Sequence, residues 1–305
     1  MRKFSVIIVA SRGGDNSSRK YLLESCLRSL SDQVYPRHLF EIIVVDSGSV
    51  VRQDFFTEIN SVYNLNLKFI PNSSNIGPAK GRNIGIRESK FDYIVFTDDD
   101  STVPPDWLSK IDDAYGRHLE AWAVGGLTLP PPDISRKNIF AAFEERLYLG
   151  YLKDGRLEEY VSSKRDEHPV FSGNISYKKE TLLKVGSFDE SFPSFISGED
   201  GDLKERALAV GGEFVFIPSV VSHHCSYTMK RFFFQQLSRG ASILRFRKRH
   251  GMENYRLLIL GRIIASFLSL PYIFFTSRFD FRYALVSWMS LIIRNIGKLY
   301  YYEKA

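Results

Sequence analysis

The chain has 305 residues, of which 44% are hydrophobic and 25% are charged. This composition is typical of a folded protein with a sizeable core, and it excludes a disordered or fibrous chain. The two cysteines, Cys26 and Cys225, are too few for a disulfide framework or a cysteine-based zinc module. The first residues, Met1–Phe4, lead into a short apolar stretch without a small-residue cleavage site. We therefore expect no secretory signal and a location in the reducing cytoplasm.

The net charge of +6 is distributed unevenly along the chain. Residues 225–305 contain 14 Lys and Arg but only 3 Asp and Glu, whereas residues 1–224 contain 27 basic and 32 acidic residues. A slightly acidic body therefore precedes a strongly basic tail. This asymmetry indicates that the two parts face different partners.

The first half of the chain alternates short apolar runs with helical patterns. Apolar residues at helical spacing between Leu22 and Leu30 predict a helix, and Pro78–Lys90 predicts another with proline near its start. The predicted strands are Phe4–Ala10, Glu41–Asp46, Leu67–Ile70 and Tyr93–Thr97. This alternation predicts an α/β domain with a mostly parallel central sheet flanked by helices.

The alternation breaks at Leu129–Asp133, where three prolines follow one another. Residues 135–170 show no clear period. Beyond them the patterns predict strands at Phe171–Tyr177, Phe214–Ile217 and Val220–His223, and helices at Lys179–Val185 and Asp202–Val210.

Acidic residues follow two of the predicted strands. Asp46 ends one, and the run Asp98-Asp99-Asp100 ends another. Ligands of parallel α/β sheets bind beyond the carboxyl ends of the strands. Clustered carboxylates repel one another and suit a hard divalent cation, Mg²⁺ or Mn²⁺, that commonly bridges to a diphosphate. The alternative for such a run is a solvated acidic turn, and its position after a buried strand favours the metal site.

A second acidic pair, Glu199-Asp200, precedes a helical pattern. Either residue could simply cap that helix and complement its dipole. Alternatively, one of them could be a general base that takes a proton from an attacking hydroxyl.

Seven motifs occur together in a fixed order. They are SVIIVAS (5–11), EIIVVDSGS (41–49), NIGPAKGRNIGI (75–86), YIVFTDDD (93–100), FSGNISYKKETLLKVGSFDE (171–190), GEDGDLKERALAVGG (198–212) and PSVVSHH (218–224). In this order the chain resembles the inverting glycosyltransferases of family 2, over roughly residues 4–228. The resemblance implies the Rossmann-like GT-A fold, a nucleotide-sugar donor and a divalent cation.

The resemblance also implies a set of donor contacts. At the ends of the first two strands these are Ala10, Ser11, Asp46 and Ser47. The others are Arg82 and Asn83 near the ribose and phosphates, Asp98 and Asp99 in the acidic run, and Gly173 and Asn174 beside the donor sugar and acceptor.

Further roles are implied by the same resemblance. Asp98 and Asp100 match the family's DxD motif, with Asp100 the expected direct metal ligand. Asp200 matches the catalytic base, with Glu199 beside it. A histidine near the metal matches His223 or His224. Because consecutive residues of a strand point to opposite faces, only one of the two histidines can face the metal, and the sequence leaves open which.

The implied reaction is a single displacement that inverts the anomeric carbon, without a covalent sugar intermediate. The sequence departs from the family at two places. The first strand ends in Ala10-Ser11-Arg12 instead of a Pro-Thr-Tyr-Asn-like run, and Ser47 replaces a second acid after Asp46. The nucleotide base therefore stays open among UDP, GDP and dTDP donors.

We divide the chain into a catalytic domain, residues 1–230, and a basic, hydrophobic helical tail, residues 231–305. The tail contains Leu257–Phe275, which is just long enough to span a bilayer but is interrupted by Arg262 and Pro271. Helices lying on anionic lipid, a true span, and a helical extension or oligomer contact all remain open. Peripheral binding would suit a lipid-linked acceptor or a growing glycan at the inner face of the cell membrane.

Three other functions are alternatives to sugar transfer. A sugar nucleotidyltransferase also combines an α/β sheet with carboxylates and a cation, but Ser11–Gly14 is a poor phosphate loop. A dinucleotide-dependent dehydrogenase lacks its G-x-G-x-x-G signature. A non-catalytic module could bind membrane or nucleic acid through the basic tail, although we expect no nucleic-acid partner. The sequence does not indicate an oligomeric state.

Overall fold

The computed structural model describes residues 1–305 except 12–15, 49–52, 153–154, 163–171, 193–197, 250–254, 278–279 and 305. The chain divides into two compact units. The first unit consists mainly of Met1–Leu129, Tyr148–Ser194 and Glu199–Cys225, and the second contains Pro130–Leu147 and Ser226–Ala305. The boundary that we predict at residue 230 stays a prediction.

The first unit is built around one mixed sheet, in the order β3-β2-β1-β4-β8-β6-β9-β5, with β7 paired to β9. Its strands are β1 (Phe4–Ser11), β2 (Phe40–Ser47), β3 (Leu67–Ile70), β4 (Tyr93–Asp98), β5 (Ser101–Thr102), β6 (Ala123–Leu129), β7 (Tyr160–Ser162), β8 (Ile175–Lys178) and β9 (Phe214–His223). Strands β3, β2, β1 and β4 run parallel, as do β6 and β9. Strand β8 lies antiparallel between β4 and β6. The predicted α/β class is confirmed.

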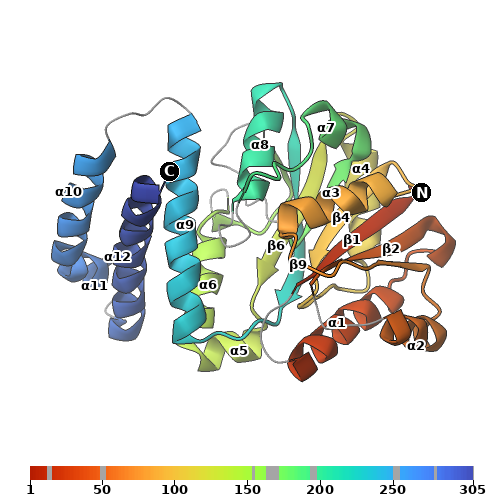
Figure 1. Ribbon diagram of the computed structural model, residues 1–305, viewed down its shortest axis with the longest axis horizontal. Coiled ribbons are helices and arrows are strands. Elements are labelled where there is room, and N and C mark those ends of the chain that lie inside the picture. The colour runs from red at the N-terminus through yellow and green to blue at the C-terminus, as the bar shows by residue number, and fades with distance from the viewer. Residues whose placement is uncertain are drawn as a thin grey trace. The chain divides into compact units, whose positions relative to one another are not determined.

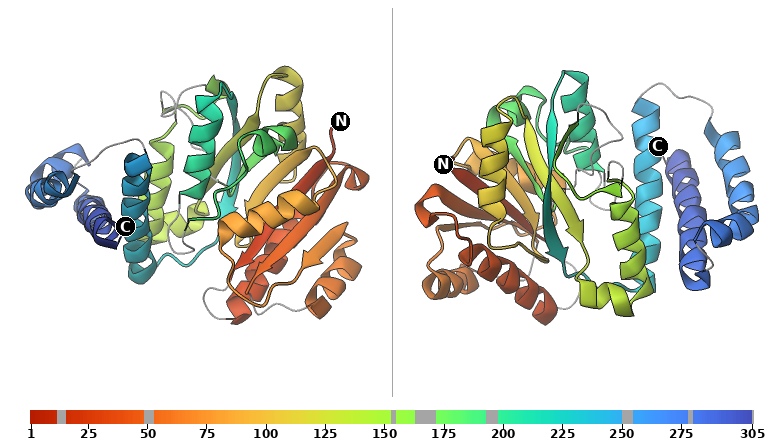
Figure 2. Two further views of the ribbon diagram at one scale, coloured as in Figure 1. Left: turned by 45° about the horizontal axis from the view of Figure 1, so that its top comes forward. Right: turned by 180° about the vertical axis from the view of Figure 1, so that it is seen from behind.

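Helices cover both faces of this sheet (Figure 1). They are α1 (Asn16–Ser31), α2 (Gln53–Tyr63), α3 (Pro78–Glu88), α4 (Trp107–Arg117), α7 (Lys179–Lys184) and α8 (Glu199–Ala209), with a 3₁₀ turn at Arg37–Leu39. Two further views show the twist of the sheet between them (Figure 2). The central strands are buried on both faces, which explains why they read as continuous apolar runs.

Alternate side chains of the strands enter two separate hydrophobic clusters. On β1, Val6 and Ile8 belong to the cluster that packs with α1, α2 and α4, whereas Ile7 belongs to the cluster with α3, α7 and α8. This alternation results from the pleat of the strand. Because both faces are fixed by packing, the carboxyl ends of β1, β2 and β4 are held together at one edge.

Two predictions about elements need correction. Phe214–Ile217 and Val220–His223 form one strand, β9, because Pro218 coincides with a register shift against β6 and does not end the pairing. Within residues 135–170, where the sequence shows no period, the structure has α5 (Pro132–Lys137), α6 (Ile139–Leu149) and β7.

The second unit is helical. Besides α5 and α6 it contains α9 (Met229–Arg249), α10 (Tyr255–Leu268), α11 (Leu270–Thr276) and α12 (Phe281–Lys304). Within the described ranges, no single helix has the length and apolar composition needed to cross a membrane. Ile259–Leu268 of α10 and α11, bent by 62° where they meet, satisfy this criterion together by length and composition.

Candidate active site

The acidic run lies where β4 ends. Asp98 is the last residue of β4, and Asp99 and Asp100 form the turn into β5. Strand β5 pairs antiparallel with the end of β9, so that Ser101 lies opposite His223. The pairing brings a histidine more than one hundred residues away in the sequence to the acidic turn.

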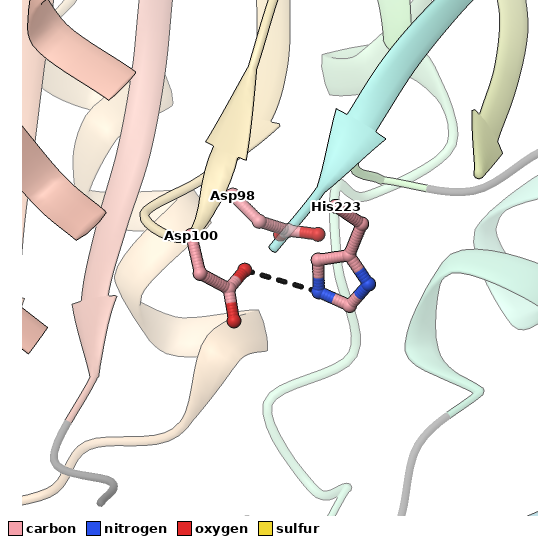
Figure 3. Close-up of side chains that lie close together, drawn as sticks. All are labelled: Asp98, Asp100 and His223. Atoms are coloured by element: carbon pink, nitrogen blue, oxygen red, sulfur yellow. Dashed lines mark ion pairs between the residues drawn. The ribbon is translucent and has the colours of Figure 1, made fainter. Parts of the chain in front are cut away.

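Asp98, Asp100 and His223 form a cluster of candidate metal ligands (Figure 3). One ligand atom from each lies within 4.8 Å of the others, and His223 Nε2 lies 3.0 Å from Asp100 Oδ1. The ring of His224 instead bonds to Thr102, with 2.8 Å between Nε2 and Oγ1, and its backbone N–H donates to the carbonyl of Asp100. The structure therefore brings His223 into the cluster and directs His224 elsewhere.

The cluster carries an electrostatic cost that a cation would relieve. Burial raises the pKa of Asp98, and repulsion from Asp100 adds to this, against the opposing effect of Arg82. Burial lowers the pKa of His223, but the Asp100 carboxylate outweighs it and raises that pKa well above its usual range. Two carboxylates and an imidazole at this spacing are a donor set that fits a divalent cation such as Mn²⁺.

A second basic side chain contacts the acidic turn. Arg19 of α1 places Nη1 3.0 Å from Asp99 Oδ1 and 3.5 Å from Asp100 Oδ2. The sequence gives no signal for this contact, because it depends on how α1 is oriented against the edge of the sheet.

Arg82 of α3 lies between the acidic run and the second acidic pair. Its Nη1 donates to Glu199 Oε1 at 2.6 Å, and its Nη2 lies 3.7 Å from Asp98 Oδ1. Both Arg82 and Glu199 are buried. The resemblance to family 2 implies Arg82 near the ribose and phosphates, and in the structure Arg82 is the cation shared by two acidic motifs.

Asp200 is the second residue of α8, directly after Glu199. Its carboxylate accepts backbone N–H bonds from Gly201 at 2.8 Å and Ser172 at 3.4 Å. Burial and the neighbouring Glu199 charge raise the pKa of Asp200 to about 6, although Arg82 and the two backbone bonds oppose the shift. A carboxylate with such a pKa is suited to general-base work near neutral pH.

The predicted donor contacts Ala10, Ser11, Asp46 and Ser47 lie together at the carboxyl ends of β1 and β2. Ala10 pairs with Asp46 and Ser11 with Ser47 in the strand register. The Ser47 hydroxyl donates to Asn75 Oδ1 at 3.1 Å and accepts from the backbone N–H of Ile76 at 3.2 Å. Through these two bonds Ser47 stabilises the loop that leads into α3. The side chain of Ser11 lies outside the described residues.

Two of the predicted donor contacts are amides that bond within the protein. Asn83 donates to the Phe188 carbonyl and to Glu190, and accepts from the Phe188 N–H. Asn174 accepts from Trp107 Nε1 at 2.8 Å and donates to two backbone carbonyls. These bonds give both amides a structural role, and their contact with the donor stays a prediction.

Gly173 lies directly beside Asp98. A Cβ atom at this position would lie 2.8 Å from Asp98 Oδ2 and 3.1 Å from the Thr128 hydroxyl. Only glycine lets the backbone approach the acidic run so closely. The structure thus brings Gly173, Asp98, Asp100 and His223 together, and links Glu199 and Asp200 to them through Arg82.

Comparison with known proteins extends this description. In Haloferax volcanii, a glucosyl-dolichyl phosphate glucuronosyltransferase is 30% identical over 172 residues, which are 55% of this chain and 50% of that protein. Glycosyltransferase AglE of the same organism is 25% identical over 224 residues, or 72% of this chain and 66% of that protein. The chain thus spans half to two thirds of the length of these relatives.

Solved structures share the fold at lower identity. A mannosyltransferase from Pyrobaculum calidifontis, in complex with GDP-Man and Mn²⁺, superposes with a TM-score of 0.65 at 15% identity, covering 99% of this chain and 88% of that one. The S. aureus protein TarS 1-349 in complex with UDP gives 0.51 at 17% identity, covering 99% of this chain and 91% of that one. These likenesses show the GT-A fold.

The model of the family described as glycosyl transferase family 2 matches residues 5–181. This match covers more than half of the chain and contains the acidic run and the predicted donor contacts of the first four strands. It agrees with the order of motifs in the sequence and with the mixed sheet. The chain belongs to glycosyl transferase family 2, the nucleotide-sugar-dependent glycosyltransferases with the GT-A fold.

Proposed function

We propose that the protein transfers a sugar from a nucleotide-sugar to a hydroxyl acceptor with inversion at the anomeric carbon. The main support for the proposal is that two acidic groups lie close together. Arg82 contacts Asp98 of the candidate metal cluster and Glu199 of the second acidic pair. The cluster consists of Asp98, Asp100 and His223, and the second pair of Glu199 and Asp200. Together they combine the donor set for a cation with a carboxylate of raised pKa at one sheet edge. A sugar nucleotidyltransferase would leave the second acidic pair without a role.

Asp98, Asp100 and His223 would hold the cation, Mg²⁺ or Mn²⁺. When bound, the cation neutralises charge on the diphosphate leaving group. Arg82 and Arg19 set the charge around these ligands, since each lies within ion-pairing distance of the acidic run. Gly173 lets the neighbouring backbone come close to Asp98.

Asp200 is the proposed base. The acceptor oxygen forms its bond to the anomeric carbon as the bond to the diphosphate breaks, and the nucleoside diphosphate leaves with that electron pair. The acceptor proton passes to the carboxylate of Asp200, which the N–H groups of Gly201 and Ser172 hold in position. Glu199, held by Arg82, keeps the start of α8 against α3.

Ala10, Ser11, Asp46 and Ser47 are the proposed contacts for the nucleoside, because they share the edge where β1 and β2 end. Arg82, Asn83, Asp99 and Asn174 complete the donor site in this proposal. The relatives do not share one donor: the Pyrobaculum mannosyltransferase structure contains GDP-Man, whereas the TarS structures contain UDP or UDP-GlcNAc.

For the acceptor we propose a lipid-linked sugar or growing glycan at the cytoplasmic face of the cell membrane. The name of the Haloferax glucuronosyltransferase places a dolichyl phosphate in its substrate, which supports a lipid-linked acceptor here. The basic composition of residues 225–305 supports an anionic membrane surface as a partner.

Thermal unfolding with Mn²⁺ and a panel of nucleoside diphosphates tests the donor site. We expect the midpoint to rise only when Mn²⁺ and one class of nucleotide are both present, because the cation and the diphosphate bind together. Asp100→Ala should abolish the shift. Asp113→Ala, which removes an exposed acid of α4, should keep it. A shift that survives in Asp100→Ala, or no shift with any nucleotide, would contradict the proposal.

A further inference from the structure

The second unit exposes large apolar side chains along α10 and α11. The exposed fractions are 64% for Ile264, 77% for Leu268, 72% for Tyr272 and 70% for Phe275. In the 18 residues from Ile259 to Thr276 the only charged residue is Arg262. An exposed apolar surface of this extent marks contact with another apolar phase.

Besides its apolar clusters, the interior of the same unit contains a group of buried polar side chains. Between α9 and α12, the side-chain oxygen of Gln236 accepts from Ser290 at 3.0 Å and from Arg294 at 2.7 Å. Between α10 and α12, Asn295 donates to Ser266 at 2.8 Å. Gln236, Ser266, Ser290 and Asn295 are all buried. Interhelical polar contacts of this kind, beneath exposed apolar side chains, are typical of helices that pack within a membrane.

The helices approach one another through glycines. A Cβ atom on Gly240 of α9 would lie 2.0 Å from the carbonyl oxygen of Arg294, and one on Gly297 of α12 would lie 2.2 Å from that of Leu237. Small residues at helix crossings, combined with interhelical hydrogen bonds, are typical of helices that pack within a membrane.

At the bend between α10 and α11, the backbone carbonyl of Ser266 accepts more than one hydrogen bond. Pro271 breaks the backbone ladder because it lacks an N–H group. The carbonyl of Ser266 accepts from the Ser269 hydroxyl and from Trp288 Nε1, both at 2.7 Å. At the end of α11, the Thr276 hydroxyl donates to the carbonyl of Tyr272 at 3.0 Å. Hydrocarbon requires such internal satisfaction of backbone groups, whereas water does not.

We propose that α10 and α11 insert into the hydrocarbon of an anionic lipid bilayer as a bent, re-entrant pair that enters and leaves by one face. This deepens the membrane association of the proposed function by naming the inserting segment and its depth. With a bend of 62°, two short helices that each lie at a shallow angle to the membrane plane can enter and leave by the same face. Arg262 would extend its guanidinium to the headgroups.

The bilayer accounts for more of these features than a second copy of the chain does. A protein partner could also cover the apolar side chains, so the charge of the unit distinguishes the two. The surplus of basic over acidic residues in 225–305 is complementary to anionic headgroups and would repel an identical surface.

Insertion depth is measured with the full chain labelled at single cysteines. Ile264→Cys and Tyr272→Cys each receive an environment-sensitive fluorophore, and Val62→Cys on α2, whose side chain is equally exposed, is the matched control. The native Cys26 and Cys225 are buried. With vesicles of phosphatidylcholine and phosphatidylglycerol, we expect a blue shift and quenching by brominated acyl chains at positions 264 and 272 and neither at 62.

A paired substitution measures how strongly the apolar surface contributes. Leu268→Asp should weaken co-sedimentation with these vesicles by about tenfold or more, because it places a carboxylate in hydrocarbon. Leu119→Asp changes another highly exposed leucine, which lies in the first unit, and should leave co-sedimentation unchanged.

Three results would overturn the proposal. Binding that high salt reverses fully, without quenching by brominated chains, would mean contact with headgroups only. A blue shift without vesicles that grows with protein concentration would mean a second copy. No binding at all would exclude lipid as the partner. The nucleotide-dependent thermal shift is independent of all three, so failure of the insertion is distinguishable from failure of the proposed activity.

Discussion

Arg82 is the cation around which the acidic residues of the site are arranged. It is buried, bonds Glu199 at 2.6 Å and lies within 4 Å of Asp98, and Asp200 is close enough to affect its pKa. A buried ion pair adds little net stability, because its attraction is offset by the cost of burying both charges. Removing one partner is costly, because the other charge then stays buried and uncompensated.

Replacing Arg82 should therefore be costly. Arg82→Met removes the guanidinium that bonds the buried Glu199 carboxylate, and we expect the free energy of unfolding in urea to fall by about 3–5 kcal/mol. Arg117→Met breaks an exposed pair with Glu159 and should cost less than about 1 kcal/mol. The double variant Arg82→Met, Glu199→Gln should regain much of the loss. Equal losses in the two single variants would contradict the role of Arg82.

The raised pKa of Asp200 leads us to expect that the rate of sugar transfer depends on pH. A base works only when deprotonated, and the pKa of Asp200 is raised to about 6, so kcat/KM of sugar transfer should rise as pH increases through that value. Asp200→Asn should lower kcat by about 10²–10⁴-fold and remove the rise. Glu199→Gln should move the rise to lower pH, since repulsion from Glu199 contributes to the raised pKa. An unchanged profile in Asp200→Asn would assign the base elsewhere.

At the scale of residues, the sequence predicts best the side chains that come directly after a buried strand. Asp98 and Asp100 could be placed for this reason. The choice of His223 over His224 could not be made, because the register of β5 on β9 decides it. The internal bonds of Asn174 depend on Trp107 and on two carbonyls from distant strands, which no local pattern reveals.

At the scale of elements, α3 is the helix that brings Arg82 to the site, and two glycines determine how closely it packs. A Cβ atom on Gly81 would lie 2.7 Å from Val9 Cγ1, and one on Gly85 would lie 2.4 Å from Ile7 Cγ2. The glycines are four residues apart and therefore share one face of the helix, against β1.

Gly85→Ala tests this packing. The added methyl must displace Ile7 or the helix, and we expect a loss of about 1–3 kcal/mol in the free energy of unfolding. Gly116→Ala is the matched control in α4, where a Cβ atom would have no neighbour within 4 Å. It should stabilise the protein by up to about 1 kcal/mol through helix propensity. Stability equal to wild type in Gly85→Ala would show that α3 can shift without cost.

The elements also show which patterns the sequence carries. The strands β1, β2, β3 and β4 were predictable because each reads as a short apolar run between helical patterns. The antiparallel insertion of β8 between β4 and β6 was not, because direction in a sheet is set by connections and leaves no trace in a four-residue strand. Helix α6 was not predicted from the sequence, because its apolar residues lie on nearly all sides of the helix and show no period.

At the scale of the whole molecule, the second unit joins two distant parts of the chain. Phe143 of α6 packs edge-on against Phe232 of α9, with ring centroids 5.5 Å apart. Glu144 accepts two bonds from Arg239, at 2.8 and 2.7 Å. Phe143 and Glu144 are both buried. A cut at residue 230 would remove both partners from α6.

Truncation at residue 230 therefore tests the predicted domain boundary. A chain ending there exposes Phe143 and leaves Glu144 without Arg239, so we expect it to unfold at a lower temperature than the full chain and to associate in solution.

The changes Phe143→Ser and Glu144→Gln should make the truncated chain more stable and less prone to associate, because they remove apolar surface and an unpaired charge. In the full chain the same changes should destabilise, since they break contacts that exist there. Calorimetry and sedimentation of the four proteins distinguish the cases. A truncated chain that is monomeric and as stable as the full chain would establish residue 230 as the boundary. If the two changes instead stabilise the truncated chain and destabilise the full chain, as we expect, α5 and α6 belong to the helical unit.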